Sequence, residues 1–111
     1  MYTKNSIRAE TLTSIDSDAL TGEYQAINPD GLSRACSILR INNDAGVSVE
    51  ISYDGTTSSD YVGAGDILEI NVGQIFPNNH GGQFVKGLVV YVMGTAGQAG
   101  AIYLTGYSQQ E

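Results

Sequence analysis

Tryptophan is absent from this 111-residue chain, and cysteine occurs only once, at Cys36. A single cysteine excludes an internal disulfide and a zinc site built from several cysteines. Only five side chains are basic, against twelve acidic ones, so the net charge is −7. Binding to nucleic acid through its phosphates needs a basic stripe, which five scattered residues do not form. The sequence therefore predicts neither a nucleic-acid partner nor a cysteine-held metal.

Long apolar runs are also missing. The longest, residues 88–93, has six residues, whereas a membrane-spanning helix needs about 20. No apolar segment follows Lys4, so the sequence predicts no secretory signal. Charged residues make up 15% of the chain, below the ~25% that is usual in soluble proteins. We expect a protein made in the cytoplasm, with no membrane partner, whose surface is neutral and polar or covered by another protein.

Glycine is plentiful, with 14 copies, and many apolar side chains lie two residues apart. Period-two alternation is typical of half-buried β-strands. The valine-rich run 88–93 predicts a central strand that is buried on both faces, and 101–105 predicts a final strand that is apolar on both faces. Seven strands are expected in all, over residues 7–13, 24–27, 36–41, 47–53, 68–72, 88–93 and 101–105.

Turn residues separate these strands. Residues 42–46 have hairpin length and include a glycine, and residues 94–100 read as the hairpin loop that joins the last two strands. Residues 14–22 read as a loop or a single helical turn. About seven short strands at even spacing predict an all-β fold, a single antiparallel β-sandwich or jelly-roll-like domain. We expect residues 1–15 to form an N-terminal arm with the first strand, able to exchange with a neighbour, and residues 16–111 to form the sandwich.

No residue pattern predicts catalysis. His80 is the one histidine, and no neighbour in sequence orients it as a general base would need. No nucleophile elbow of the G-x-S-x-G type occurs. Cys36 lies in an apolar strand, where a free cysteine usually packs as a small hydrophobic side chain. We therefore expect a protein that is not an enzyme.

No pattern predicts a metal or a cofactor either. Asp54 and Asp60 come nearest to a calcium-binding arrangement, but the spacing of an EF-hand is missing. Aspartates in such loops usually accept hydrogen bonds from the local backbone. The glycines at 94, 97 and 100 lack the helix that follows a dinucleotide-binding loop. We assign no catalytic residue, no metal ligand and no cofactor.

Between residues 36 and 107 the chain resembles small structural proteins of tailed bacteriophage virions. The resemblance rests on residues 51–55 with their SYDG sequence, 60–62, 84–87 with KG, 90–97, and 102–107 with GY. It implies a β-sandwich subunit of the virion that decorates and stabilises the capsid. A head–tail connector, a tail protein or a fibre-associated protein is the alternative. In this family the partners are the major capsid protein or other virion proteins.

Tyrosine is the main candidate for binding, since exposed tyrosines are enriched at interfaces. An N-terminal arm with β-prone residues around Ile7 can add a strand to a neighbour's open sheet edge, so we expect a homo-oligomer such as a trimer or ring. A second hypothesis is a carbohydrate- or receptor-binding module whose aromatic face uses Tyr61, Tyr91 and Tyr107. The residues assigned to the interface are Tyr2, Ile7, Tyr61, Asn78, Asn79 and His80.

Overall fold

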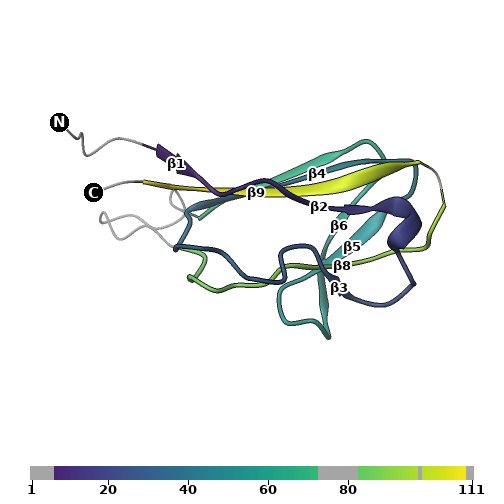
Figure 1. Ribbon diagram of the computed structural model, residues 1–111, viewed down its shortest axis with the longest axis horizontal. Helices are drawn as coiled ribbons and strands as arrows, with labels where there is room; N and C mark the ends of the chain where they lie inside the picture. The colour runs from purple at the N-terminus through teal and green to yellow at the C-terminus, as the bar shows by residue number, and fades with distance from the viewer. Residues whose placement is uncertain (1–6, 73–82, 98, 110–111) are drawn as a thin grey trace.

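Alternation of apolar and polar side chains builds two β-sheets that pack face to face (Figure 1). The computed structural model describes residues 7–72, 83–97 and 99–109. In chain order the elements are β1 (Ile7–Ala9), β2 (Thr13–Asp16), the 3-10 turn η1 (Ser17–Ala19), β3 (Gln25–Ala26), β4 (Ile38–Ala45), β5 (Val49–Ser52), β6 (Ser58–Val62), β7 (Ile67–Asn71), β8 (Tyr91–Met93) and β9 (Gly100–Gln109). Within these ranges no helix has the length and apolar character needed to cross a membrane.

The two sheets are antiparallel throughout. The first has the order β1-β9-β4-β7, and β2 also pairs with β9 beyond the end of β1. The second has the order β3-β8-β5-β6. This arrangement confirms the expected all-β fold, an antiparallel β-sandwich. Within a single chain β1 pairs with β9, and exchange of the arm with a neighbour would form the same pairing between two chains.

The core lies between the sheets and is apolar. From the first sheet, Leu39, Ile41, Ile102 and Leu104 point inward and are at most 2% exposed. Their neighbours along the strands, such as Arg40 and Tyr103, point to the outer face, as the pleat requires. Cys36 is fully buried in this core, which confirms that it packs as a small hydrophobic side chain. The second sheet contributes Val49, Ile51, Val62, Val90 and Val92.

Asn43 is the polar exception in this core. It lies on β4, is 0% exposed, and hydrogen-bonds through both its Nδ2 and its Oδ1. Its Nδ2 donates to the carbonyls of Val47 (2.8 Å), Val62 (3.2 Å) and Gly63 (3.2 Å). Its Oδ1 accepts from the backbone N–H of Ala45 at 3.1 Å. One side chain of the first sheet therefore holds the end of β6 in the second sheet and Val47, two residues before β5.

Several local expectations are wrong, and the reasons are physical. Residues 42–46 look like a hairpin turn, but residues 42–45 continue β4, because the Asn43 side chain turns into the core. Residues 94–100 likewise do not form a hairpin, since they carry the chain from β8 in the second sheet to β9 in the first. The strand β6 was not expected, because its Ser-Ser-Asp sequence lacks apolar alternation.

The first strand also differs from its prediction. Residues 7–13 are not one strand, since residues 10–12 face only 105 and 106 on β9 and form a bulge between β1 and β2. Within residues 14–22, the predicted helical turn is present as η1, but residues 14–16 belong to the strand β2. The central position of β8 is confirmed. Its burial on both faces is only partial, since Val92 is buried but Tyr91 and Met93 are half-buried.

Asn43→Ala is expected to lower the free energy of unfolding by about 3 kcal/mol, because buried polar groups left unpaired cost about 1–3 kcal/mol each. The variant loses four hydrogen bonds to the backbone, although the Gly63 carbonyl still accepts from the N–H of Asp66. Asn42→Ala is the matched control, since Asn42 points outward and makes no side-chain hydrogen bond with the described residues. Urea unfolding of the two variants measures the difference, and equal losses would contradict the role of Asn43.

Gly31→Ala is expected to destabilise the protein by about 1–3 kcal/mol more than Gly22→Ala, because of overpacking. Both glycines have positive φ, +77° and +84°, so both variants carry the cost of a left-handed backbone. A Cβ at Gly31 would lie 2.5 Å from the carbonyl oxygen of Gly87, whereas a Cβ at Gly22 would meet nothing within 4 Å. Thermal unfolding of the pair tests this, and equal melting temperatures would refute it.

Candidate functional site

Tyr61 is the predicted interface residue whose side chain the structure describes. It lies on β6, at the edge of the second sheet, and is 68% exposed. Ile7 lies on β1 and pairs with Gln109 of β9. Tyr2, Asn78, Asn79 and His80 fall outside the described residues. The interface prediction can therefore be followed here only at Tyr61 and at the backbone of Ile7.

A broad groove surrounds Tyr61 on the outer face of the second sheet. Tyr61 and Met93 lie on either side of Glu50 in the strand register. The groove has a volume of about 640 Å³, and much of its lining is small, with Gly46 and Ala64 among its residues. It therefore presents one exposed ring and one carboxylate over a shallow floor.

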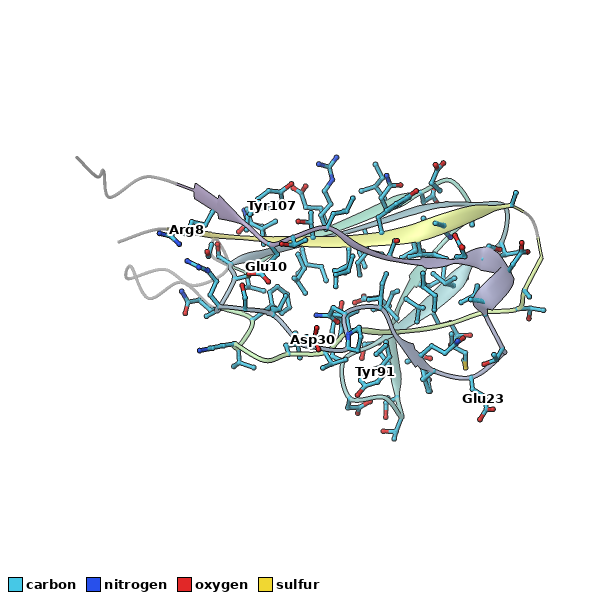
Figure 2. All side chains as sticks on the ribbon, in the orientation of Figure 1. Arg8, Glu10, Glu23, Asp30, Tyr91 and Tyr107 are labelled. Atoms are coloured by element: carbon cyan, nitrogen blue, oxygen red, sulfur yellow. The ribbon has the colours of Figure 1, made fainter. Side chains whose placement is uncertain are left out.

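The three tyrosines predicted for a sugar-binding face do not share a face. Tyr61 and Tyr91 belong to the second sheet, and Tyr107 belongs to β9 of the first. Figure 2 shows Tyr91 and Tyr107 on different layers of the molecule. Tyr91 also lies beneath the loop after β5, where its ring is 3.3 Å from the position of a Cβ at Gly55. These three side chains therefore do not form one binding surface.

A second hollow, on the outer face of the first sheet, was missed by the sequence reasoning. It has a volume of about 420 Å³. Its side chains come from β4, from β9 and from the bulge between β1 and β2. The sequence indicated only that residues 103, 105 and 107 share one face of a strand. Their neighbours on β4 follow from the pairing register, which the sequence does not give. The residues that line this hollow are Leu12, Arg40, Asn42, Tyr103, Thr105 and Tyr107.

Asp54 holds the loop that connects β5 to β6. Its Oδ1 accepts hydrogen bonds from the backbone N–H groups of Thr56 and Thr57, both at 2.8 Å, and from the Ser52 hydroxyl at 2.9 Å. The two backbone donors in particular hold the pKa of this carboxyl well below its usual range. The SYDG sequence thus forms the loop after β5, and Asp54 accepts the hydrogen bonds that hold this loop.

Asp60 is also engaged in local structure. The Tyr53 hydroxyl donates to its Oδ2 at 2.7 Å. Burial, together with this bond and the charge of Asp60, raises the pKa of the Tyr53 hydroxyl. In the described part of the chain, no group of three or more histidine, cysteine or acidic side chains comes together as a metal site would need.

Cys36 is enclosed between the sheets. Its thiol donates to the Arg34 carbonyl at 3.4 Å. Burial raises its pKa to about 11, and the nearby carboxylate of Glu10 contributes in the same direction. A thiol with this pKa is protonated at neutral pH and is a poor nucleophile. Its surroundings are those of a structural residue.

Cys36 is expected to make the folded state less stable as the pH rises from 9 to 11. Its folded pKa of about 11 exceeds the unfolded value of 9.0, so the folded state binds more protons in this window and stability falls. The loss by pH 11 is on the order of 2 kcal/mol. Urea unfolding at several pH values should show a steeper fall for the natural chain than for Cys36→Ala, and parallel curves would contradict it.

Comparison with known proteins does not show a family for this chain. No family model matches it, and no curated protein matches it. Among solved structures the chain is similar to one described as "Bacillus endospore appendages form a novel family of disulfide-linked pili". The two share 18% sequence identity over 100% of this chain and 97% of the other, with a TM-score of 0.41. A likeness at that level carries neither a fold nor a function over to this chain.

Proposed function

We propose that this chain is a non-enzymatic structural subunit that acts by assembling with copies of itself and with other proteins of a tailed-bacteriophage virion. The observation that carries the proposed assembly is the location of its exposed apolar side chains. Among the described residues, four large hydrophobic side chains are more than half exposed, and two of them, Tyr61 and Ile67, lie on the outermost strands of the sheets.

Outermost strands are the positions where exposed apolar side chains are least expected in a monomer. An open edge offers unpaired backbone groups to other chains, and monomeric proteins usually protect it with charges or short strands. Tyr61 on β6 is 68% exposed, and Ile67 on β7 is 52% exposed. Within the described residues, no further strand pairs with the outer side of β6 or β7. An assembly that covers these edges would remove the apolar side chains from water.

The turn between β6 and β7 brings these two edges to the same side of the sandwich. β6 is the last strand of the second sheet, β7 is the last strand of the first, and only residues 63–66 separate them. Asn43 fixes this turn, because its N–H donates to the Asp66 carbonyl at 2.9 Å and its own carbonyl accepts from Gly65 at 2.9 Å. The two edges therefore form one continuous side, suited to a single partner.

The location in the virion rests on the resemblance to phage structural proteins. Two of the segments on which this resemblance rests stabilise the fold. SYDG forms the loop after β5, and Gly87 of the KG sequence packs against Gly31. We favour capsid decoration, with a head–tail, tail or fibre position as the alternative. The N-terminal arm supplies a strand to a neighbouring subunit in this proposal. The protein is made in the host cytoplasm and ends in the particle.

Immunogold electron microscopy tests the location directly. An antiserum against the purified chain is applied to phage particles from the source culture. Label over the heads supports capsid decoration, and label at the neck, tail or fibres supports the alternative position in the virion. Absence of label from intact and gently opened particles, with the purified chain as positive control, would overturn the virion proposal.

Tyr61→Ser and Ile67→Ser are each expected to weaken self-association at least about tenfold, since a buried tyrosine or aliphatic anchor contributes more than the ~1.4 kcal/mol that corresponds to tenfold. Val85→Ser is the matched control, because Val85 is 64% exposed but lies outside the named strands. Sedimentation velocity over a concentration series measures the effect. An equal effect of all three substitutions would contradict assembly through these edges.

A further inference from the structure

The hollow on the outer face of the first sheet is built around Thr105 in the middle of β9. Tyr103 and Tyr107 stand two residues to either side of Thr105 on the same face, about 13 Å apart along the strand. Arg40 of β4 lies opposite Thr105 in the register, and Asn42 lies opposite Tyr103. Leu12, in the bulge, lines the hollow as well and is 59% exposed.

Polar groups in this hollow have their hydrogen-bonding capacity unused. Within the described residues, no ion pair or side-chain hydrogen bond involves the guanidinium of Arg40, the amide of Asn42 or the hydroxyls of Tyr103 and Tyr107. The Thr105 hydroxyl donates to the Glu10 carbonyl at 3.1 Å, which leaves its lone pairs free to accept. The hollow thus combines two aromatic rings, a planar cation, an amide and a hydroxyl acceptor.

Arg40 favours an anionic occupant of this hollow, whereas the net charge of the chain and the neighbouring Glu69 oppose one. The chain carries a net charge of −7 with only five basic residues, yet the basic side chain in this hollow, Arg40, makes no ion pair with the described residues. A guanidinium presents a planar fork of donors that matches a carboxylate bidentately. The nearest carboxylate in the register, that of Glu69 on β7, lies beside Arg40 on the same face.

We propose that this hollow binds a carboxylate-bearing sugar residue of a glycan, a uronic or sialic acid. Arg40 binds the carboxylate, the ring of Tyr103 or Tyr107 packs against the C–H face of the sugar, and Asn42 and Thr105 bind its hydroxyls. The volume of 420 Å³ lies in the ~300–1,000 Å³ range of small-molecule sites. This binding site does not depend on the virion proposal, and its ligand would be bound without any chemical change.

The position of the hollow argues against an extended peptide that pairs with the backbone of a strand. It lies over β9 and β4, which have strands on both sides, so their backbone groups are not available to an extended peptide. A second copy stacked on the same hollow about a two-fold axis would bring two Arg40 side chains together, which like-charge repulsion opposes. Recognition here must use side chains alone, as it does for a sugar.

Titration followed by ¹H–¹⁵N NMR tests the proposal on the full chain. The probes are sodium D-glucuronate and sodium N-acetylneuraminate, with D-glucose as the neutral control and poly-L-glutamate as the acidic peptide. We expect shift changes at residues 40, 42, 103, 105 and 107 with at least one acidic sugar, and binding at least tenfold weaker for glucose. No shift change with either acidic sugar up to about 10 mM, a concentration that detects a Kd near 1 mM, would overturn the proposal. Tighter binding of poly-L-glutamate at these residues would overturn it in favour of a protein partner.

Two variants with opposite expected effects separate a site from a general charge effect. Arg40→Met keeps the aliphatic stem and should weaken binding of the acidic sugar at least tenfold, whereas Arg34→Met, at an exposed arginine outside the hollow, should change it less than twofold. Glu69→Gln removes the competing carboxylate and should strengthen binding severalfold, a gain that misfolding cannot produce. Equal losses in Arg40→Met and Arg34→Met, or no gain in Glu69→Gln, would refute the assignment of Arg40.

Discussion

The structure depends on one buried amide. Asn43 belongs to a strand of the first sheet, yet its side chain binds the backbone at Val62 and Gly63, at the end of β6 in the second. Loss of its four hydrogen bonds to the backbone would cost several kcal/mol at most, a large part of the ~5–15 kcal/mol that stabilises a typical domain. Hydrophobic packing holds the sheets together, and Asn43 decides how β4, β5 and the turn before β7 meet.

That constraint reaches the surface through the turn between β6 and β7. Because Asn43 binds the backbone on both sides of this turn, the outermost strands of the two sheets follow each other on one side of the sandwich. Tyr61 and Ile67 lie on those strands and are exposed. The proposed interface and the core are therefore coupled. A substitution at Asn43 should weaken self-association as well as lower the free energy of unfolding. The hollow around Arg40 lies over interior strands and is independent of this edge.

Sequence patterns were sufficient for the fold class, because alternation reports directly which face of a strand is buried. They also located Cys36 in the core and β8 inside its sheet. They failed where polar residues serve the fold: the Asn43 region resembled a turn, and β6, rich in serine, resembled a loop. The hollow could not be predicted, since Leu12, Arg40 and Tyr107 become neighbours only through the register of β9 with its partners. The predicted interface residues Asn78, Asn79 and His80 lie outside the described residues.

The proposed assembly covers the edges formed by β6 and β7. Hydrogen exchange of the unaltered protein, measured together with its native mass at low and high concentration, tests this most directly. We expect a mass above that of the 11.7 kDa chain at high concentration, with amide protection gained in residues 58–62 and 67–71. A mass of one chain at every concentration, or an assembly in which those amides exchange as fast as in the monomer, would contradict it.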